Sequence, residues 1–97
     1  MKMIKHIVFW KIKDGNKKEN MQRMKQLLEG LQGRIPGLLK AEVGFAIDSG
    51  KHYDVALYSE FLSKEALDAY QDHPEHLVVK SFVRSVITAR SCVDYEI

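Results

Sequence analysis

The segment AYQDHPEH, residues 69–76, carries side chains whose types and spacing could support chemistry. It places Tyr70, His73 and His76 at three-residue intervals around Pro74. A neutral imidazole can accept a proton near pH 7, and a phenol can donate one to a developing oxygen anion. If Pro74 begins a helix, His76 lies in the first turn, where the helix dipole disfavours the imidazolium and lowers its pKa. The segment therefore predicts an acid/base pair of His76 and Tyr70.

A metal site is a second interpretation of the same segment. Zinc needs several nitrogen, sulfur or oxygen ligands, which Asp72, His73, His76 and His6 could supply. Their spacing is not the HExxH arrangement of a helical zinc site, and the proline between the two imidazoles aims the rings differently. We therefore expect no metal and no cofactor.

A structural role is the third interpretation. His73 could simply cap the helix that begins at Pro74, and Tyr70 could be a core aromatic with its hydroxyl toward solvent. His6 could be a buried histidine bonded to a backbone carbonyl. These roles remain open beside the chemical ones, because one sequence does not show which side chains converge.

Alternating apolar residues predict the strands that would position these groups. They extend over residues 4–12, 39–47, 53–61 and 83–95, with a hairpin connection at Asp48-Ser49-Gly50. A helical stripe follows Asn16, which with Glu19 fits a capping box, and Gly33 would end that helix.

Two shorter helices are expected in the second half of the chain. Ser63 is a suitable N-cap for a helix ending near Gln71, and Pro74 suits the first position of another helix extending to about Ser81. The residue before a proline disfavours helical angles, so His73 should be a hinge.

The element order β-α-β-β-α-β predicts a single α+β domain over residues 1–97, a ferredoxin-like fold with an antiparallel four-stranded sheet. Its helices can cover only one face of the sheet. We assign to that face Ile4, Val8, Trp10, Val43, Phe45, Val55, Leu57, Ile87 and Val93. The other face would carry Ile7, Phe9, Ala56 and Tyr58 among Lys5, Lys11, Asp54, Glu60 and Arg90. Two copies packed sheet to sheet would bury this mixed face, so we expect a homodimer rather than a monomer with a half-polar sheet.

Composition excludes several functional classes. Fifteen Lys and Arg against thirteen Asp and Glu give a net charge of +2, without the basic stripe of a nucleic-acid binder. No segment has membrane-spanning length or a cleavable leader, which predicts a cytoplasmic protein. The lone Cys92 is expected to be a packing residue on the charged sheet face. Glycine loops that cradle phosphate, dinucleotide fingerprints and serine-nucleophile motifs are also missing.

Five segments in register resemble the stress-responsive α/β-barrel (Dabb) family: IKHIVFWKIKDG, IPGLLKAEVG, YDVALYSEF, ALDAYQDHPEH and VDYEI. The resemblance implies a ferredoxin-like subunit whose homodimer forms a barrel. Most bacterial members of that family lack an assigned activity, and some plant members cyclise polyketides by aldol chemistry. The acid/base pair of those cyclases falls on Tyr70 and His76, and the first-strand histidine falls on His6. A polar pocket position of the cyclases is Val55 here, which departs from the pattern.

The function that these observations favour is binding of a small, largely apolar molecule with a carbonyl or phenol group, between sheet and helices. We expect His76, Tyr70 and His6 as catalytic groups and Trp10, Val55, His73 and Tyr53 as ligand-binding residues. One alternative is a non-catalytic stress or assembly protein. Another is cofactor-free oxygenation in an aromatic pocket that Trp10, Tyr53 and Tyr70 could line. A closed, filled space between His6, Tyr70 and His76 would favour the non-catalytic class, and an open cavity there would favour a ligand.

Overall fold

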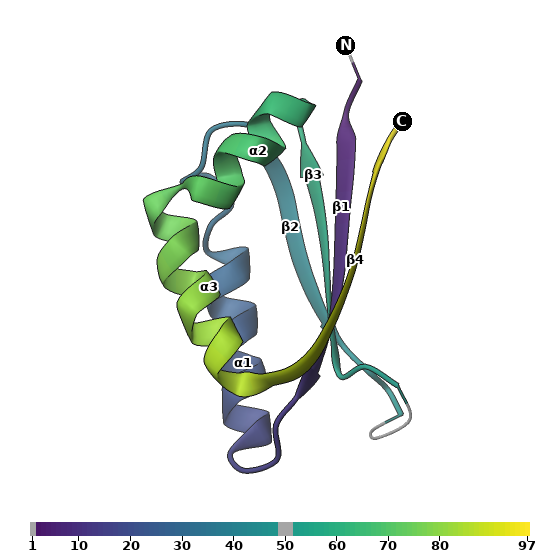
Figure 1. Ribbon diagram of the computed structural model, residues 1–97, viewed down its shortest axis with the longest axis vertical. Coiled ribbons are helices and arrows are strands. Elements are labelled where there is room, and N and C mark those ends of the chain that lie inside the picture. Colours follow the sequence, from purple (N-terminus) through teal and green to yellow (C-terminus); the bar gives the residue numbers. More distant parts are fainter. Residues whose placement is uncertain (1, 49–51) are drawn as a thin grey trace.

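The computed structural model describes residues 2–48 and 52–97. The elements in chain order are β1 (Ile4–Ile12), α1 (Lys17–Glu29), β2 (Leu38–Phe45), β3 (Val55–Phe61), α2 (Lys64–Asp72), α3 (Pro74–Val86) and β4 (Ile87–Glu96). Figure 1 shows one sheet with the helices on one of its faces. The predicted ferredoxin-like order is confirmed, with its second helical unit divided into α2 and α3.

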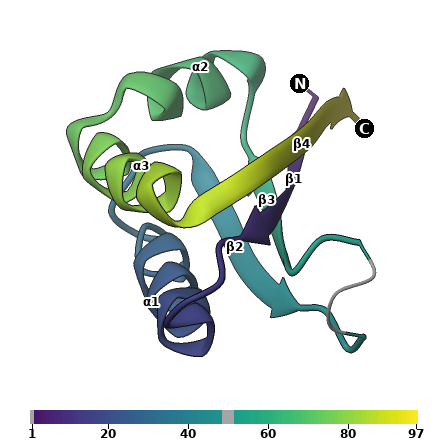
Figure 2. The same cartoon turned by 60° about the horizontal axis from the view of Figure 1, so that its bottom comes forward.

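The four strands form one sheet in the order β2-β3-β1-β4, and every neighbouring pair is antiparallel. β1 therefore lies between β3 and β4, and β4 forms an edge. Figure 2 shows β4 leaving the end of α3 and running away from the helices toward the end of the sheet where both termini lie. The start of β1 and the end of β4 lie at the same end of the sheet, where the backbone N–H of Ile97 donates to the carbonyl of Met3 at 3.0 Å. None of the helices described is long and apolar enough to cross a membrane.

The core fills the space between the sheet and the helices. Burial alternates along β1, where Ile4, His6, Val8, Trp10 and Ile12 are buried and the residues between them are not. This period of two is the one expected of a strand with a single covered face. Met24 and Leu28 from α1 and Val79, Val83 and Val86 from α3 complete the same core. The covered face predicted for β1 and β3 is confirmed by this burial.

The break between α2 and α3 lies where Pro74 predicts it. His73 adopts extended angles, φ −65° and ψ 133°, and its Nδ1 accepts a hydrogen bond from the N–H of Glu75 at 3.1 Å. Ser63 caps α2 by accepting from the N–H of Ala66 at 3.1 Å. Both predicted caps are confirmed, and the hinge turns α3 back over the sheet.

The predicted boundary of the last strand is wrong. A strand was expected from Val83, but α3 continues to Val86 and β4 begins at Ile87. Val79, Val83 and Val86 are buried at helical spacing, so this apolar run satisfies the helix period as well as the strand period.

The register of β4 corrects three face assignments. Partners across an antiparallel pair share a face, and Val93 lies opposite Ile7, Cys92 opposite Val8 and Arg90 opposite Trp10. Val93 is therefore on the uncovered face, while Arg90 and Cys92 are on the helix side. Asp54 was also misplaced, because its carboxylate is buried against the N–H of Ile12, at 2.8 Å.

The predictions for the two ends of α1 are wrong. Asn16 has φ 53° and makes no side-chain cap, and α1 ends at Glu29, before Gly33.

The predicted bounds and faces of β2 and β3 also need correction. A bulge between Leu38 and Lys40 turns Leu38 into the core and leaves Leu39 exposed. β2 also ends before Ile47, which is exposed, and β3 begins at Val55, after the predicted start. The hairpin predicted at Asp48-Ser49-Gly50 falls partly outside the described residues.

Candidate functional site

Tyr70 and His76 form a stacked pair at the junction of α2 and α3. Their ring centroids are 3.9 Å apart and the planes are inclined by 22°. Nδ1 of His76 also lies 3.0 Å from the backbone carbonyl oxygen of Tyr70. A carbonyl only accepts, so Nδ1 carries the proton and Nε2 is left as an acceptor. The hinge at His73 makes this contact, because it brings the first turn of α3 against the last turn of α2.

A cavity of about 260 Å³ opens beside this pair, between the sheet and α3. Trp10, Leu57, Val83 and Ile87 supply apolar lining from β1, β3, α3 and β4. Tyr70, Gln71 and His76 line the side formed by the helix junction. The volume lies near the lower end of ligand pockets in general, so it suits a molecule of about one ring.

Three cationic side chains also line the cavity: Lys80 and Arg84 from α3 and Arg90 from β4. Its lining contains no Asp or Glu. Within residues 2–48 and 52–97, no carboxylate forms an ion pair with any of these three cations. The chain carries a net charge of only +2, so the positive charge is concentrated at this site. Such a lining favours an anionic group on a ligand.

The environment keeps both members of the pair neutral at pH 7. The pKa of His76 is lowered from 6.5 to about 4, mainly by burial and to a smaller extent by the positive charge of Lys80, while backbone contacts of Tyr70 and Gln71 oppose the change. The direction agrees with the sequence prediction, although burial is the larger cause. Burial also raises the pKa of the Tyr70 phenol. His76 is thus available as a proton acceptor and Tyr70 as a proton donor.

The hydroxyl of Tyr70 has no hydrogen-bond partner among the described residues. No fully shielded side-chain nitrogen or oxygen in that part of the chain lacks a partner, so this hydroxyl reaches solvent, on the side where Tyr70 lines the cavity. A ligand oxygen could therefore accept from it without displacing another protein group.

His6 lies behind the pair rather than in the cavity lining. It is buried, with its ring edge-on to that of Tyr70 at a centroid distance of 6.2 Å. Its Nδ1 lies 2.5 Å from Oδ1 of Asp94, so the expected backbone carbonyl partner is replaced by a carboxylate. Cys92 also approaches, with Sγ 3.8 Å from the same nitrogen. Burial, and then the charge of Asp94, raise the pKa of this thiol, which disfavours it as a nucleophile.

The remaining predicted site residues are dispersed. Trp10 lines the cavity, whereas Val55 is core and does not. His73 caps α3. Tyr53 lies on the uncovered face, with its ring 5.9 Å from that of Phe9 and its hydroxyl 2.6 Å from Oγ of Ser91. An aromatic pocket of Trp10, Tyr53 and Tyr70 is therefore not formed.

Sequence reasoning missed the cationic lining. His76, Lys80 and Arg84 recur at intervals of four residues and so share one face of α3. That signal was available, but the short helix predicted over residues 74–81 ended before Arg84. Arg90 was missed because its face depends on the register of β4.

Comparison with known proteins gives a consistent result. The model of the Stress responsive A/B Barrel Domain (Dabb) matches residues 4–97. A dimeric protein of unknown function from Bacteroides fragilis, with a ferredoxin-like fold, is 35% identical, with a TM-score of 0.89 over 98% of this chain and 96% of that one. A dimeric ferredoxin-like protein from Thermobifida fusca is 23% identical, with a TM-score of 0.87 over 99% and 92%.

A more distant structure has a named activity. The hydroxynitrile lyase of Passiflora edulis is 18% identical, with a TM-score of 0.86 over 98% of this chain and 93% of that one. At that identity the likeness shows the fold alone. No curated protein matches this chain.

Proposed function

Because the chain belongs to the stress-responsive A/B barrel (Dabb) family, we propose that it binds a small, largely apolar molecule with a carbonyl or phenol group in the cavity beside Tyr70 and His76. The observation that carries the proposal is the stacked pair itself, which lines an open cavity instead of a filled core. That cavity favours the ligand-binding interpretation over a non-catalytic stress or assembly protein.

The pair has complementary roles in acid/base chemistry of the aldol or cyclase type. Nε2 of His76 would accept a proton from the carbon next to a carbonyl group, since Nδ1 is held by the carbonyl oxygen of Tyr70. The Tyr70 hydroxyl would donate a hydrogen bond to the oxygen that becomes negative as an enolate forms. His6 would contribute indirectly, by holding the ring of Tyr70 edge-on.

The cationic lining refines the ligand class. Lys80, Arg84 and Arg90 would stabilise an enolate or phenolate, or bind a carboxylate carried by the same molecule. Trp10 and Leu57 would contact its apolar part. We therefore expect an aromatic or short aliphatic acid with a carbonyl group to bind better than its neutral amide.

A homodimer through the uncovered sheet face belongs to the same proposal. Phe9, Val93 and Tyr95 are exposed on that face, beside the partly buried Ile7 and Tyr58. The Bacteroides fragilis and Thermobifida fusca proteins compared above are both dimeric. Packing two such faces together would remove this apolar surface from water.

The ligand class is tested with 4-acetylbenzoate and the matched neutral probe 4-acetylbenzamide. The single tryptophan, Trp10, lines the cavity, so its indole N–H resonance reports binding directly by NMR. We expect a saturable shift with the acid and a weaker one with the amide. Arg84→Gln should reduce the difference between the two probes, while Arg23→Gln on α1 should preserve it. A Trp10 resonance that neither probe moves would contradict the proposal.

Acid/base turnover is tested by following deuterium exchange from heavy water into the acetyl methyl group of 4-acetylbenzoate. The protein should accelerate exchange, because His76 would remove a methyl proton and Tyr70 would support the enolate. His76→Gln and Tyr70→Phe should each abolish the acceleration. Equal exchange rates with the wild type and both variants would contradict the acid/base role and would leave only ligand binding.

A further inference from the structure

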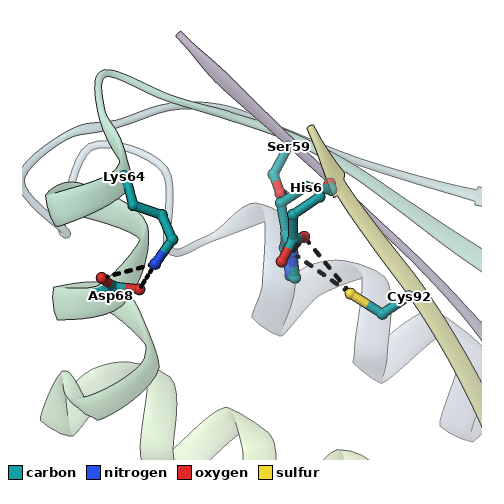
Figure 3. Close-up of polar contacts among 6 residues, drawn as sticks. His6, Ser59, Lys64, Asp68 and Cys92 are labelled. Atoms are coloured by element: carbon teal, nitrogen blue, oxygen red, sulfur yellow. Dashed lines mark hydrogen bonds and ion pairs between the residues drawn. The ribbon is translucent and has the colours of Figure 1, made fainter. Parts of the chain in front are cut away.

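A second group of reactive side chains lies outside the cavity, on the helix side of β1 and β4. It consists of His6, Cys92 and Asp94, whose donor atoms all lie within 4.8 Å of one another. Nδ1 of His6 is 2.5 Å from Oδ1 of Asp94, and Sγ of Cys92 is 3.8 Å from that nitrogen and 3.6 Å from that oxygen. Figure 3 shows the sulfur of Cys92 directed at His6. Neither Cys92 nor Asp94 lines the cavity described above.

The strand register is what brings these groups together. Asp94 lies directly opposite His6 across the β1–β4 pair, and Cys92 precedes Asp94 by two residues, so all three side chains share one face. His6 is anchored in the core, while Cys92 and Asp94 lie on the exposed edge strand. The group is thus fixed at its inner end and open to solvent at its outer end.

A cysteine nucleophile relay does not fit this geometry. In such a relay the carboxylate holds one ring nitrogen and the other nitrogen takes the proton of the thiol. Here the carboxylate and the sulfur both approach Nδ1 of His6. Three different donor atoms directed at one point are instead the arrangement of ligands around an ion.

We propose that His6, Cys92 and Asp94 bind a divalent transition-metal ion, with zinc as the best fit. Mixed nitrogen, sulfur and oxygen ligands suit zinc or cobalt and disfavour magnesium or calcium. Ligand bonds of about 2.0–2.3 Å put tetrahedral ligand atoms roughly 3.3–3.7 Å apart. The two distances from sulfur are close to that range, and the nitrogen–oxygen pair would open by less than about 1 Å.

Bound metal would take the place of the hydrogen shared between His6 and Asp94, so the His6 ring would carry its proton on Nε2, and binding would release the proton of the Cys92 thiol to solvent. Lys64 on α2 would oppose the ion only weakly, because Asp68 holds its Nζ at 2.8 and 2.9 Å. Figure 3 shows this lysine directed at Asp68. A fourth coordination position would remain for water or an exogenous ligand.

Cobalt(II) is the probe for the experiment, using protein freed of any histidine tag. We expect saturation at one ion per chain, with the visible bands of tetrahedral cobalt and the near-ultraviolet band of a thiolate ligand. Cys92→Ser should remove the thiolate band, and Asp94→Asn should weaken binding at least about ten-fold. Asp72→Asn, which removes an exposed carboxylate outside the group, is the matched control and should bind like the wild type.

Zinc protection of the thiol is the second measurement, and it requires no variant. Cys92 is the only cysteine, so alkylation by iodoacetamide reports this site alone. We expect zinc to slow alkylation at least about ten-fold, since a metal-bound thiolate is shielded. The proposal is overturned if cobalt binding is not saturable, if Cys92→Ser keeps the full spectrum, or if zinc leaves the alkylation rate unchanged. None of these measurements involves the cavity ligand.

Discussion

The imidazole of His76 stacks on the ring of Tyr70 at 3.9 Å and bonds through Nδ1 to the backbone carbonyl of the same tyrosine. The two residues are therefore joined twice, once through their rings and once through the backbone at the end of α2. His76 is a structural partner of Tyr70 as well as a proposed base. The two side chains should therefore contribute unequally to stability, because His76 makes both the ring contact and the backbone contact.

Tyr70→Phe and His76→Ala should differ in their effect on stability. The Tyr70 hydroxyl has no hydrogen-bond partner in the described part of the chain, so its removal should change the free energy of unfolding by less than about 0.5 kcal/mol. His76→Ala removes a stacked buried ring and a buried hydrogen bond, and should cost about 2 kcal/mol. Urea denaturation measures both. Equal losses in the two variants would show that the hydroxyl has an essential structural contact.

Stability should fall between pH 6.5 and pH 4 because of His76. Burial lowers the pKa of His76 from 6.5 to about 4, so the folded state favours the neutral ring and the unfolded state takes up the proton first. The stabilisation is complete above pH 6.5 and is lost as pH falls toward 4, by up to about 3 kcal/mol.

His76→Gln is the control for this pH dependence, since glutamine does not titrate. Denaturation of both proteins across this range isolates the contribution of His76 from that of carboxylates such as Asp54. Burial raises the pKa of Asp54, but the N–H of Ile12 and the charge of Lys17 outweigh it and lower that pKa, so its stabilisation is lost only at lower pH. Parallel pH profiles for wild type and His76→Gln would contradict the assignment.

Phe9→Asp should convert a dimer into a folded monomer. Phe9 lies at the centre of the uncovered face, and an aspartate there would place a charge in the proposed sheet-to-sheet interface, where desolvation is costly. Sedimentation velocity at micromolar concentration measures the change. Val78→Asp, at an exposed position on α3, introduces the same charge elsewhere and should leave the dimer intact. A monomeric wild type would rule out this interface.

Gly37→Ala should destabilise the protein more than Gly33→Ala. Both glycines have left-handed backbone angles, φ +83° and +88°, so an added Cβ costs about 1–2 kcal/mol at either position. At Gly37 the added atom would also lie 2.5 Å from Cβ of Ala66 in α2, whereas at Gly33 it meets nothing within 4 Å. We expect an additional loss of about 1–3 kcal/mol at Gly37. Thermal or urea denaturation of the two variants measures the difference between their losses of stability. Equal losses would show that α2 moves away from the added Cβ at little cost.

Local patterns predicted most of the fold because they follow from short-range physics. Alternation along β1 identifies its buried face, and Pro74 divides α2 from α3 because its ring excludes a continuous helix. Residues 83–86 were predicted as strand but belong to α3. Val79, Val83 and Val86 fit the buried stripe of a helix, while the apolar residues that follow fit a strand. Propensity alone does not locate the boundary between them.

The candidate sites depended on information that no local pattern contains. Tyr70 and His76 are near in sequence, so their pairing could be predicted. The position of Arg90 at the cavity and the convergence of Cys92 with His6 depend on how β4 pairs with β1. The predicted alternation was continuous, whereas a bulge between Ile87 and Ala89 shifts the register by one residue and places both side chains on the other face of the sheet. Register is a property of the assembled sheet, and one sequence constrains it weakly.

The hydrogen bond between Ile97 and Met3 indicates how the fold would respond to force applied at its two ends. β1 and β4 are antiparallel neighbours whose outer ends meet at one end of the sheet, so force applied through both chain ends pulls the two strands apart sideways, beginning at that end. The hydrogen bonds between β1 and β4 would then break in sequence from that end. In a sheared pair they would all be loaded at once. The rung between His6 and Asp94 is among the first to be loaded. A tether at the two ends would therefore peel β4 from the sheet at low force, while the stacked pair on the helices remained in place.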